Sequence, residues 1–310
     1  MQRLIIDTDT ASDDAVAIMM ALAKRDVTVE ALTIVAGNVN LKQASINARY
    51  TLELCKADIP VYEGCDRPWI RAPSTAEWFH GHDGMGNMQY PTPRQPAQNK
   101  HAVPELINRF RAAKNQIDLV TLGPLTNLAT ALAVEPELAG WIRHCYVMGG
   151  AAATLGNVTP AAEYNIWCDP EAAKRVLQSG MSITLLGWEL SCEEATLDDL
   201  EVADILALDT DRARLAIQSN CTAVDALRQL QGQAGLALAD PVAMAVALDP
   251  SIATNSSRHY VDIETNSALT RGMTVVDKNH VTGNEPNAEV CFAIDTSRWK
   301  ELLRRSLELS

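Results

Sequence analysis

Apolar and polar positions alternate along the chain in a regular order of short runs and longer periodic stretches. Continuous apolar runs that predict buried strands lie at 3–7, 27–37, 117–123, 144–150 and 182–187. Helical spacing of apolar residues follows at about 13–24, at about 41–55 and after residue 123. This order of strand and helix predicts right-handed crossovers and a mostly parallel sheet with helices on both faces.

The last third of the chain has a different order of elements. Helices are predicted at about 209–230 and 240–248, strands at 258–263, 272–277 and 288–294, and a terminal helix from 297. No linker rich in Gly, Pro or Ser and no internal repeat divides the chain. We therefore expect a single α/β domain over residues 1–310, with an open, Rossmann-like sheet.

One segment, 64–100, has no periodicity and is too long for an ordinary connection. It is rich in proline and carries the sequence WFHGHDGMGN at 78–87. A long ordered loop within a compact domain is usually a lid or a binding loop. We expect this loop to border the active site.

Composition and charge narrow the function classes. The chain has 310 residues, of which 47% are hydrophobic, and a formal net charge of −13. This charge disfavours nucleic acid and anionic membranes as partners, because both require a basic face. No apolar run approaches the roughly 20 residues that span a bilayer, and strand-like sequence from Leu4 leaves no room for a signal peptide. With seven scattered cysteines and no CxxC pair, we expect a soluble, cytoplasmic protein with a small-molecule ligand.

Four aspartates lie close together where the first strand meets the first helix. Asp7 and Asp9 end the strand, and Asp13 and Asp14 begin the helix. Helix capping by Asp13 and a favourable helix dipole at Asp14 explain two of these acids. They do not explain four, because neighbouring carboxylates raise one another's pKa. A bound divalent cation removes the repulsion, and all-oxygen ligands favour a hard ion, Ca²⁺ or Mg²⁺.

A further acid, Asp240, precedes Pro241 and an apolar helix near the end of the chain. Taken alone, this pattern is explained equally well by a helix N-cap followed by proline in the first turn. Together with the aspartates of the first strand, it is a candidate for another metal ligand.

The segment 156–176 carries a third group of polar residues before a helix expected from about residue 170. Glu163 and Asn165 alternate, so in an extended segment both face one side while Tyr164 faces the other. Carboxylate and amide groups of this kind, including Asn157, suit the vicinal hydroxyls of a sugar. The alternative is a polar turn.

Taken together, these motifs resemble the inosine-uridine preferring nucleoside hydrolase family. DTDTASDDA (7–15) is similar to the family signature DTDPGxDDA. The similarity continues in the same order through TIVAGNV (33–39), LGPLTNLA (122–129), YVMGG (146–150), GNVTPAAEYNIWCDPEAA (156–173) and ADP (239–241). The resemblance implies the nucleoside hydrolase fold, hydrolysis of ribonucleosides to ribose and free base, and a homodimer or homotetramer.

The resemblance also implies a role for individual residues. It implies a calcium ion held by the carboxylates of Asp9, Asp14 and Asp240 and by the backbone carbonyl of Leu122. Asp9 then accepts the proton of a calcium-bound water that attacks C1′, steadied by Asn38, through an oxocarbenium-like transition state. The residues implied to hold the ribose are Asp13, Met148, Asn157, Glu163 and Asn165.

The sequence departs from the family pattern at two places. Thr10 and Ala11 replace the usual Pro-Gly of the signature, and we expect the ion site to survive this change. Ala239 stands where many relatives have a histidine that protonates the departing base, and a methyl group cannot do so. We therefore assign a catalytic or base-contacting role to His82 on the long loop, and stacking on the base to Trp78 and Tyr164.

Two alternatives remain open at this point. The chain is either an enzyme or a Ca²⁺- and ribose-binding relative that lost turnover together with the histidine. IIDTDT (5–10) also fits the nucleophile loop of haloacid-dehalogenase-like phosphatases, with Asp7 as nucleophile. The flap and the later acidic pair of that family are not evident in the sequence, which disfavours this second alternative.

Overall fold

A single sheet runs through the molecule. The structure, a computed structural model, describes residues 1–231 and 235–309. Within these residues the strand order is β3-β2-β1-β4-β5-β6-β9-β7-β8. The strands are β1 (Gln2–Thr8), β2 (Val27–Ile34), β3 (Val61–Glu63), β4 (Asp118–Thr121), β5 (Cys145–Met148), β6 (Ile183–Leu186), β7 (Ala253–Ile263), β8 (Thr274–Asp277) and β9 (Ala288–Ile294).

Most neighbouring strands are parallel, as predicted. All pairs from β3 to β9 are parallel, whereas β7 pairs antiparallel with both β9 and β8. Strand β1 lies inside the sheet, and its residues Leu4, Ile5 and Ile6 are completely buried. A parallel strand covered on both faces is apolar throughout rather than alternating, which explains the continuous run that begins the chain.

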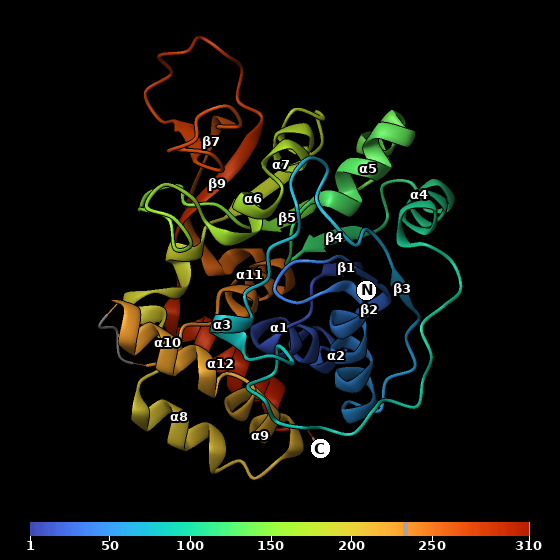
Figure 1. Cartoon of the computed structure of the whole chain (residues 1–310), viewed down its shortest axis with the longest axis vertical. Coiled ribbons are helices and arrows are strands. Elements are labelled where there is room, and N and C mark those ends of the chain that lie inside the picture. The colour runs from blue at the N-terminus through green and yellow to red at the C-terminus, as the bar shows by residue number, and fades with distance from the viewer. Residues whose placement is uncertain (232–234, 310) are drawn as a thin grey trace.

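Helices cover both faces of the sheet (Figure 1). They are α1 (Ser12–Ala23), α2 (Leu41–Leu54), α3 (Glu77–His80), α4 (Ala102–Ala112), α5 (Thr126–Val134), α6 (Tyr164–Cys168), α7 (Pro170–Leu177), α8 (Asp199–Leu206), α9 (Asp211–Gln218), α10 (Cys221–Gln231), α11 (Ala239–Leu248) and α12 (Thr296–Leu307), with 3-10 turns η1 (Pro136–Gly140), η2 (Trp188–Ser191), η3 (Glu193–Ala195) and η4 (Pro250–Ile252).

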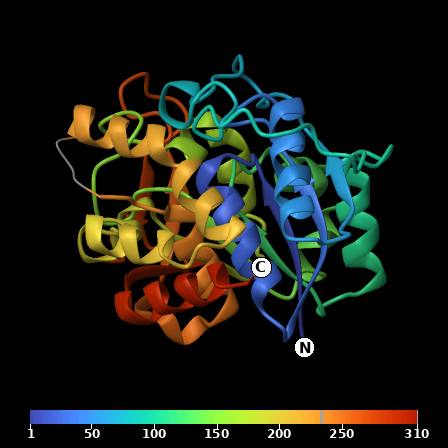
Figure 2. The same ribbon diagram turned by 90° about the horizontal axis from the view of Figure 1, so that it is seen from below.

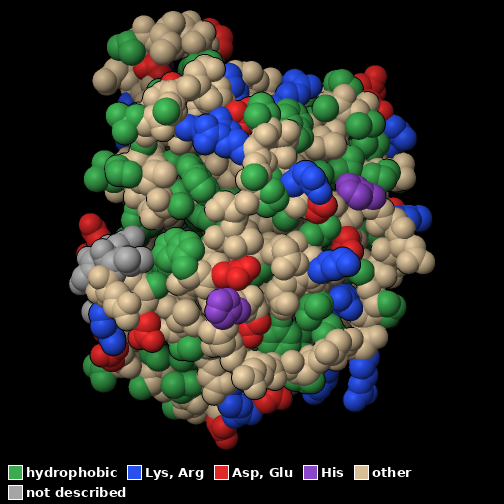
Figure 3. Space-filling view, viewed as in Figure 1, with side chains coloured by type: hydrophobic (Ala, Val, Ile, Leu, Met, Phe, Trp, Pro, Cys, Tyr) green, Lys and Arg blue, Asp and Glu red, His purple; other side chains and the backbone are tan. Residues whose placement is uncertain are grey.

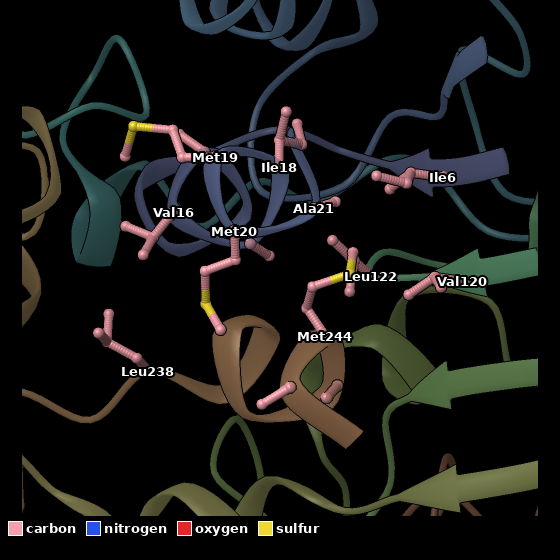
Figure 4. Packing of buried hydrophobic residues seen from close by; sticks show 14 of the residues in the cluster. Ile6, Val16, Ile18, Met19, Met20, Ala21, Val120, Leu122, Leu238 and Met244 are labelled. Carbon is pink, nitrogen blue, oxygen red and sulfur yellow. The ribbon is translucent and has the colours of Figure 1, made fainter. Parts of the chain in front are cut away.

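The buried apolar residues form two clusters, one on each face of the sheet. One cluster joins β1 and β2 to α1, α2, α9, α11 and α12, and the other joins the sheet to α4, α5 and α7. Helix α1 passes between α2 and the C-terminal helices, as the view from below shows (Figure 2). Met20 of α1 and Met244 of α11 lie at the contact between these two helices (Figure 4). Because α1 packs against α11, the N-terminus of α1 lies close to the N-terminus of α11.

Some predicted elements differ from the structure. The stretch 209–230 is two helices, α9 and α10, rather than one. Strand β7 begins at Ala253, five residues before the predicted start. Residues 254–258 are exposed and polar, so no apolar pattern marks them as a strand, and pairing with β9 makes them one. The prediction also missed β3, α4 and α8. Both errors in the strands arise where pairing with a neighbour, rather than an apolar pattern, decides the structure.

The described helices include none that is long and apolar enough to cross a membrane. On the face shown in Figure 3, Lys and Arg side chains lie interspersed with Asp and Glu rather than in one continuous patch.

The complete burial of β1 leads to a prediction on stability. Leu4→Ala should lower the free energy of unfolding by about 2–5 kcal/mol, because a buried leucine loses its transfer energy and leaves a cavity. The midpoint of urea unfolding measures this loss. The same substitution at Leu269, which is 83% exposed, should change the midpoint little. Equal effects of the two substitutions would contradict the assignment of β1 to the core.

Candidate active site

The aspartates identified in the sequence lie at the carboxyl end of β1 and at two helix N-termini. Asp7, Asp9 and Asp14 are completely buried, and Asp240 in the first turn of α11 is 3% exposed. One carboxylate oxygen each of Asp13, Asp14 and Asp240 lies within 4.8 Å of the other two. The packing of α1 against α11 therefore brings Asp240 to the first cluster across more than 200 residues of sequence.

The helix-capping explanations for Asp13 and Asp240 are wrong. Helix α1 begins at Ser12 with Ala11 as its N-cap, and α11 begins at Ala239 with Leu238 as its N-cap; neither cap makes a side-chain hydrogen bond. Asp14 does support its helix end, because its carboxylate accepts hydrogen bonds from the Ala11 amide at 2.9 Å and from the Thr8 hydroxyl at 2.5 Å. Capping thus explains the placement of one acid of the cluster.

The Asp9 carboxylate is closely surrounded by backbone, and only one of its two oxygens accepts a hydrogen bond from the described residues. Its Oδ2 accepts a hydrogen bond of 2.6 Å from the Asn38 amide, while its Oδ1 has no hydrogen-bond partner among the described residues. A Cβ at Gly37 would lie 2.1 Å from Oδ2, and a Cβ at Gly123 would lie 2.5 Å from Oδ1. Both positions require glycine so that the backbone can approach this carboxylate closely. Asp13 Oδ1 is likewise buried without a partner in the described part of the chain.

Burial makes these carboxylates costly to ionise. The pKa of Asp9 is raised well above its ordinary value by desolvation and then by the charge of Asp14. Desolvation, followed by the charge of Asp13, raises the pKa of Asp14 to about 7. Burial and the neighbouring Asp13 and Asp14 also raise the pKa of Asp240 well above normal. Buried oxygen donors of this kind, with two oxygens lacking partners, fit a hard divalent cation, which would restore the ionised state.

The segment that was predicted to bind ribose has a different local structure from the one expected. Residues from Tyr164 form the short helix α6, and Glu163 is its N-cap, accepting hydrogen bonds from the amides of Asn165 and Ile166. The expectation of an extended segment is therefore wrong, although Glu163 and Asn165 still point toward the same cavity. Glu163 also accepts from the Gly150 amide at 2.7 Å, and burial raises its pKa to about 7.

Asn165 connects this helix to the end of β4. Its side-chain amide donates to the carbonyl oxygen of Leu122 at 2.8 Å and to that of Met148 at 3.3 Å. Asn157 accepts a hydrogen bond of 3.0 Å from the Tyr164 amide. The predicted ribose residues and the Leu122 carbonyl therefore belong to one hydrogen-bonded group.

These residues line a cavity of about 400 Å³. Its polar residues include Asp13, Asn38, His80, Asn157, Glu163, Asn165, Ser191 and Asp240. Its apolar and aromatic residues include Ala76, Trp78, Phe79, Met148, Val158, Trp188, Leu227 and Ala239. Phe79, Trp188, Ser191 and Leu227 were not predicted. Phe79 lies in the loop that the sequence identified, whereas the other three come from segments whose sequence shows no motif. The cavity contains the polar groups needed for a sugar and an apolar surface suited to a flat ring.

Of the two loop histidines, the structure brings His80 and not His82 to the cavity. The His82 side chain is 90% exposed and lies 3.4 Å from Glu77. His80 ends α3, lines the cavity and is 7% exposed. Burial lowers the pKa of His80, so its ring is neutral near pH 7. The motif HGHDG identified the loop, but the end of α3 at Gly81, with φ of +87°, decides which ring faces inward.

The two predicted stacking residues have different environments. The Tyr164 hydroxyl donates to the carbonyl oxygens of Gly37 and Ser74, so this buried side chain attaches the 64–100 loop to the site. Trp78 is 54% exposed and borders the cavity. Asp7 lies behind the site, where Thr33 and Asn127 donate hydrogen bonds of 2.5 and 2.9 Å to it.

The fold and the site define an α/β enzyme with a buried oxygen-ligand cluster at the carboxyl ends of parallel strands. The chain belongs to the inosine-uridine preferring nucleoside hydrolase family, whose model matches residues 4–301. It is a nucleoside N-ribosyl hydrolase, and the phosphatase alternative is wrong.

Known relatives are similar over almost the whole chain. The pyrimidine-specific ribonucleoside hydrolase RihA of Salmonella gallinarum is 37% identical, with 98% of each chain covered. Among solved structures, the plant nucleoside hydrolase PpNRh1 has a TM-score of 0.93 at 30% identity, covering 100% of this chain and 99% of that one. A purine-preferring ribonucleoside hydrolase from Gardnerella vaginalis has a TM-score of 0.92 at 26% identity, covering 99% and 98%. The fold class is therefore confirmed.

The carboxylate cluster predicts that a divalent cation stabilises the folded state. Adding Ca²⁺ to chelator-treated protein should raise the melting temperature, by the equivalent of about 2.7 kcal/mol at a hundred times the Kd. Asp240→Asn should lose most of this rise, because it removes one carboxylate of the cluster. The exposed Asp204 on α8 provides the control, since Asp204→Asn should retain the full rise. An unchanged rise in Asp240→Asn would contradict this site.

Proposed function

We propose that the chain is a calcium-dependent hydrolase of ribonucleosides that releases ribose and free base. The observation that supports this most directly is the cavity, whose lining combines acidic side chains, among them Asp13 with a buried oxygen that has no partner among the described residues, with apolar and aromatic walls. Calcium is favoured over magnesium because it accepts several carboxylate and carbonyl oxygens in irregular geometry, whereas magnesium retains much of its water.

Asp9, Asp14, Asp240 and the Leu122 carbonyl are the residues that would hold the ion. When bound, calcium would supply positive charge that orients the vicinal hydroxyls of ribose and lowers the pKa of water. Asp9 accepts the proton of the attacking water through Oδ1, because its Oδ2 is occupied by the Asn38 amide. Gly37 and Gly123 keep this carboxylate from turning away, since both backbones lie against it.

The acidic surroundings also act on the sugar. As the C1′–N bond breaks, positive charge develops on the ribose ring. Asp13 and Glu163 line the same cavity and stabilise that charge. Asn157, Asn165 and Met148 hold the ribose, with the Asn165 amide kept in orientation by Leu122 and Met148.

At the base end, the residues differ from those expected from sequence. Ala239 lines the cavity and offers no proton. We assign the contact with the base to His80 in place of His82, and stacking to the walls formed by Trp78, Phe79 and Trp188. The names of the relatives include both a pyrimidine-specific and a purine-preferring hydrolase, so the base preference of this enzyme has to be measured.

A hydrolysis screen tests the proposal as a whole. Inosine, adenosine, guanosine, uridine and cytidine are each incubated with the enzyme, with chelator, and with chelator followed by excess Ca²⁺. Reducing-sugar release should occur with at least one nucleoside, disappear on chelation and return with Ca²⁺. Absence of release from every nucleoside, with ribose still raising the melting temperature, would instead favour the ribose-binding alternative.

Asp9→Ala should lower kcat by at least about 10²–10⁴-fold, because the attacking water loses its proton acceptor. The far-ultraviolet circular dichroism spectrum should remain that of the wild type. Asp26→Ala, at an exposed acid outside the cavity, should retain full activity. An Asp9→Ala enzyme with wild-type turnover would refute the role of Asp9.

The polar end of the cavity predicts discrimination against 2′-deoxynucleosides. A site built to bind a hydroxyl rejects an analogue without it by about 10⁴–10⁵-fold, because its own polar groups lose their partner. We expect kcat/KM for deoxyuridine to be lower than for uridine by a factor that approaches this range. If the enzyme prefers purines, the same decrease is expected between a purine ribonucleoside and its 2′-deoxy form. Comparable values for both sugars would contradict recognition of the diol.

A further inference from the structure

Ser12 and His80 form a contact that the proposed chemistry does not use. Ser12 is the first residue of α1, immediately before the acidic pair, and is completely buried. Its Oγ lies 2.8 Å from Nδ1 of His80, which comes from the 64–100 loop. Two segments separated by 68 positions in sequence therefore meet at the edge of the cavity.

The hydrogen of this contact belongs to the serine. The imidazole Nδ1 is the hydrogen-bond partner that Ser12 Oγ has among the described residues. If Nδ1 donated to Oγ, the buried serine hydroxyl would be left without an acceptor, which costs about 1–3 kcal/mol. Donation from Ser12 to Nδ1 satisfies both groups. In a neutral imidazole the second nitrogen, Nε2, then carries the hydrogen.

The segments that carry the two residues are held together by a second contact. The Asn47 side-chain amide donates to the Thr10 carbonyl at 2.8 Å and to the Asp83 carbonyl at 2.9 Å. The carbonyl of His80 itself accepts from the Gly86 amide at 2.9 Å. The backbone on both sides of the Ser12–His80 contact is thus fixed, and the serine hydroxyl determines which nitrogen carries the hydrogen.

We propose that Ser12 is a positioning residue that holds His80 in the Nε2–H tautomer, so that Nε2–H donates a hydrogen bond to the departing base. This inference rests on the proposed function. As water attacks C1′, the electron pair of the C1′–N bond passes to the base and the water proton passes to Asp9. Nε2–H stabilises the negative charge on the base without giving up its proton, and the released base takes its proton from solvent.

The test compares leaving groups that differ in their need for this hydrogen bond. The substrates are the best nucleoside of the screen and 4-nitrophenyl β-D-ribofuranoside, whose leaving group is stable as an anion. Ser12→Ala should lower kcat on the nucleoside by about tenfold or more, with KM changed by less than about threefold. On the nitrophenyl riboside, kcat should stay within about twofold of the wild type. Ser12→Thr, which keeps the hydroxyl, should restore turnover of the nucleoside.

Two controls separate positioning from a structural role. Ser306→Ala removes another buried helical hydroxyl, which donates within α12 far from the cavity, and should leave both substrates unaffected. In a His80→Gln background, Ser12→Ala should add no further loss, because the two residues act as one unit. Equal losses on both substrates, or an additive loss in the double variant, would overturn the proposal.

A measurement on the unmodified protein does not depend on turnover. In wild-type enzyme with ¹⁵N-labelled histidine, the chemical shifts of His80, assigned with His80→Gln, should show Nε2 protonated and Nδ1 as acceptor. Protonation at Nδ1 would overturn the proposal even if Ser12→Ala failed to fold. A wild type that hydrolyses no nucleoside would refute the proposed function, while the tautomer measurement would still decide the role of Ser12.

Discussion

The structure depends on the burial of several carboxylates at the carboxyl end of β1. Asp9, Asp14 and Asp240 lie in the interior, and burial together with mutual repulsion raises the pKa of each. Each of these carboxylates is therefore costly to ionise where it lies. A divalent ion would supply a positive charge that all members can share. This requirement explains why the acids at this end of the sheet face one another and not solvent.

The surrounding backbone is adapted to the same constraint. Glycines at 37 and 123 lie against the Asp9 carboxylate at distances that a Cβ would not allow. The N-termini of α1 and α11 meet here, and neither Asp13 nor Asp240 is the N-cap of its helix, so both remain available to the cavity. Helix packing, through residues such as Met20 and Met244, is therefore also what holds the acidic site together.

The polar and the aromatic residues of the cavity come from different kinds of structural element. Its polar residues lie on or beside strands and helix ends, with Asn165 and Glu163 hydrogen-bonded to neighbouring backbone. Trp78 and Phe79 come from the long loop and Trp188 from the turn after β6, whereas Tyr164 comes from α6 and is held by hydrogen bonds of its hydroxyl to the carbonyl oxygens of Gly37 and Ser74. Ala239 and the loop histidine His80 both lie in the cavity wall. The aromatic side of the cavity thus depends mainly on loop placement, whereas the polar side depends on the sheet and on helix ends.

The sequence by itself determined the α/β class, the parallel order of the sheet and the acids at the end of β1. These features follow from local periodicity and from residues that are neighbours in the chain. It failed for β3 and for the polar start of β7, because pairing with a neighbouring strand decides those segments. It also failed for the short helix at Tyr164, which is capped by the adjacent Glu163.

The choice between His80 and His82, two residues apart on one loop, could not be made from the motif. It depended on the end of α3 at Gly81 and on Ser12 at the start of α1. A side chain's neighbours in space are set by packing between distant segments, and only the tertiary structure decides those contacts.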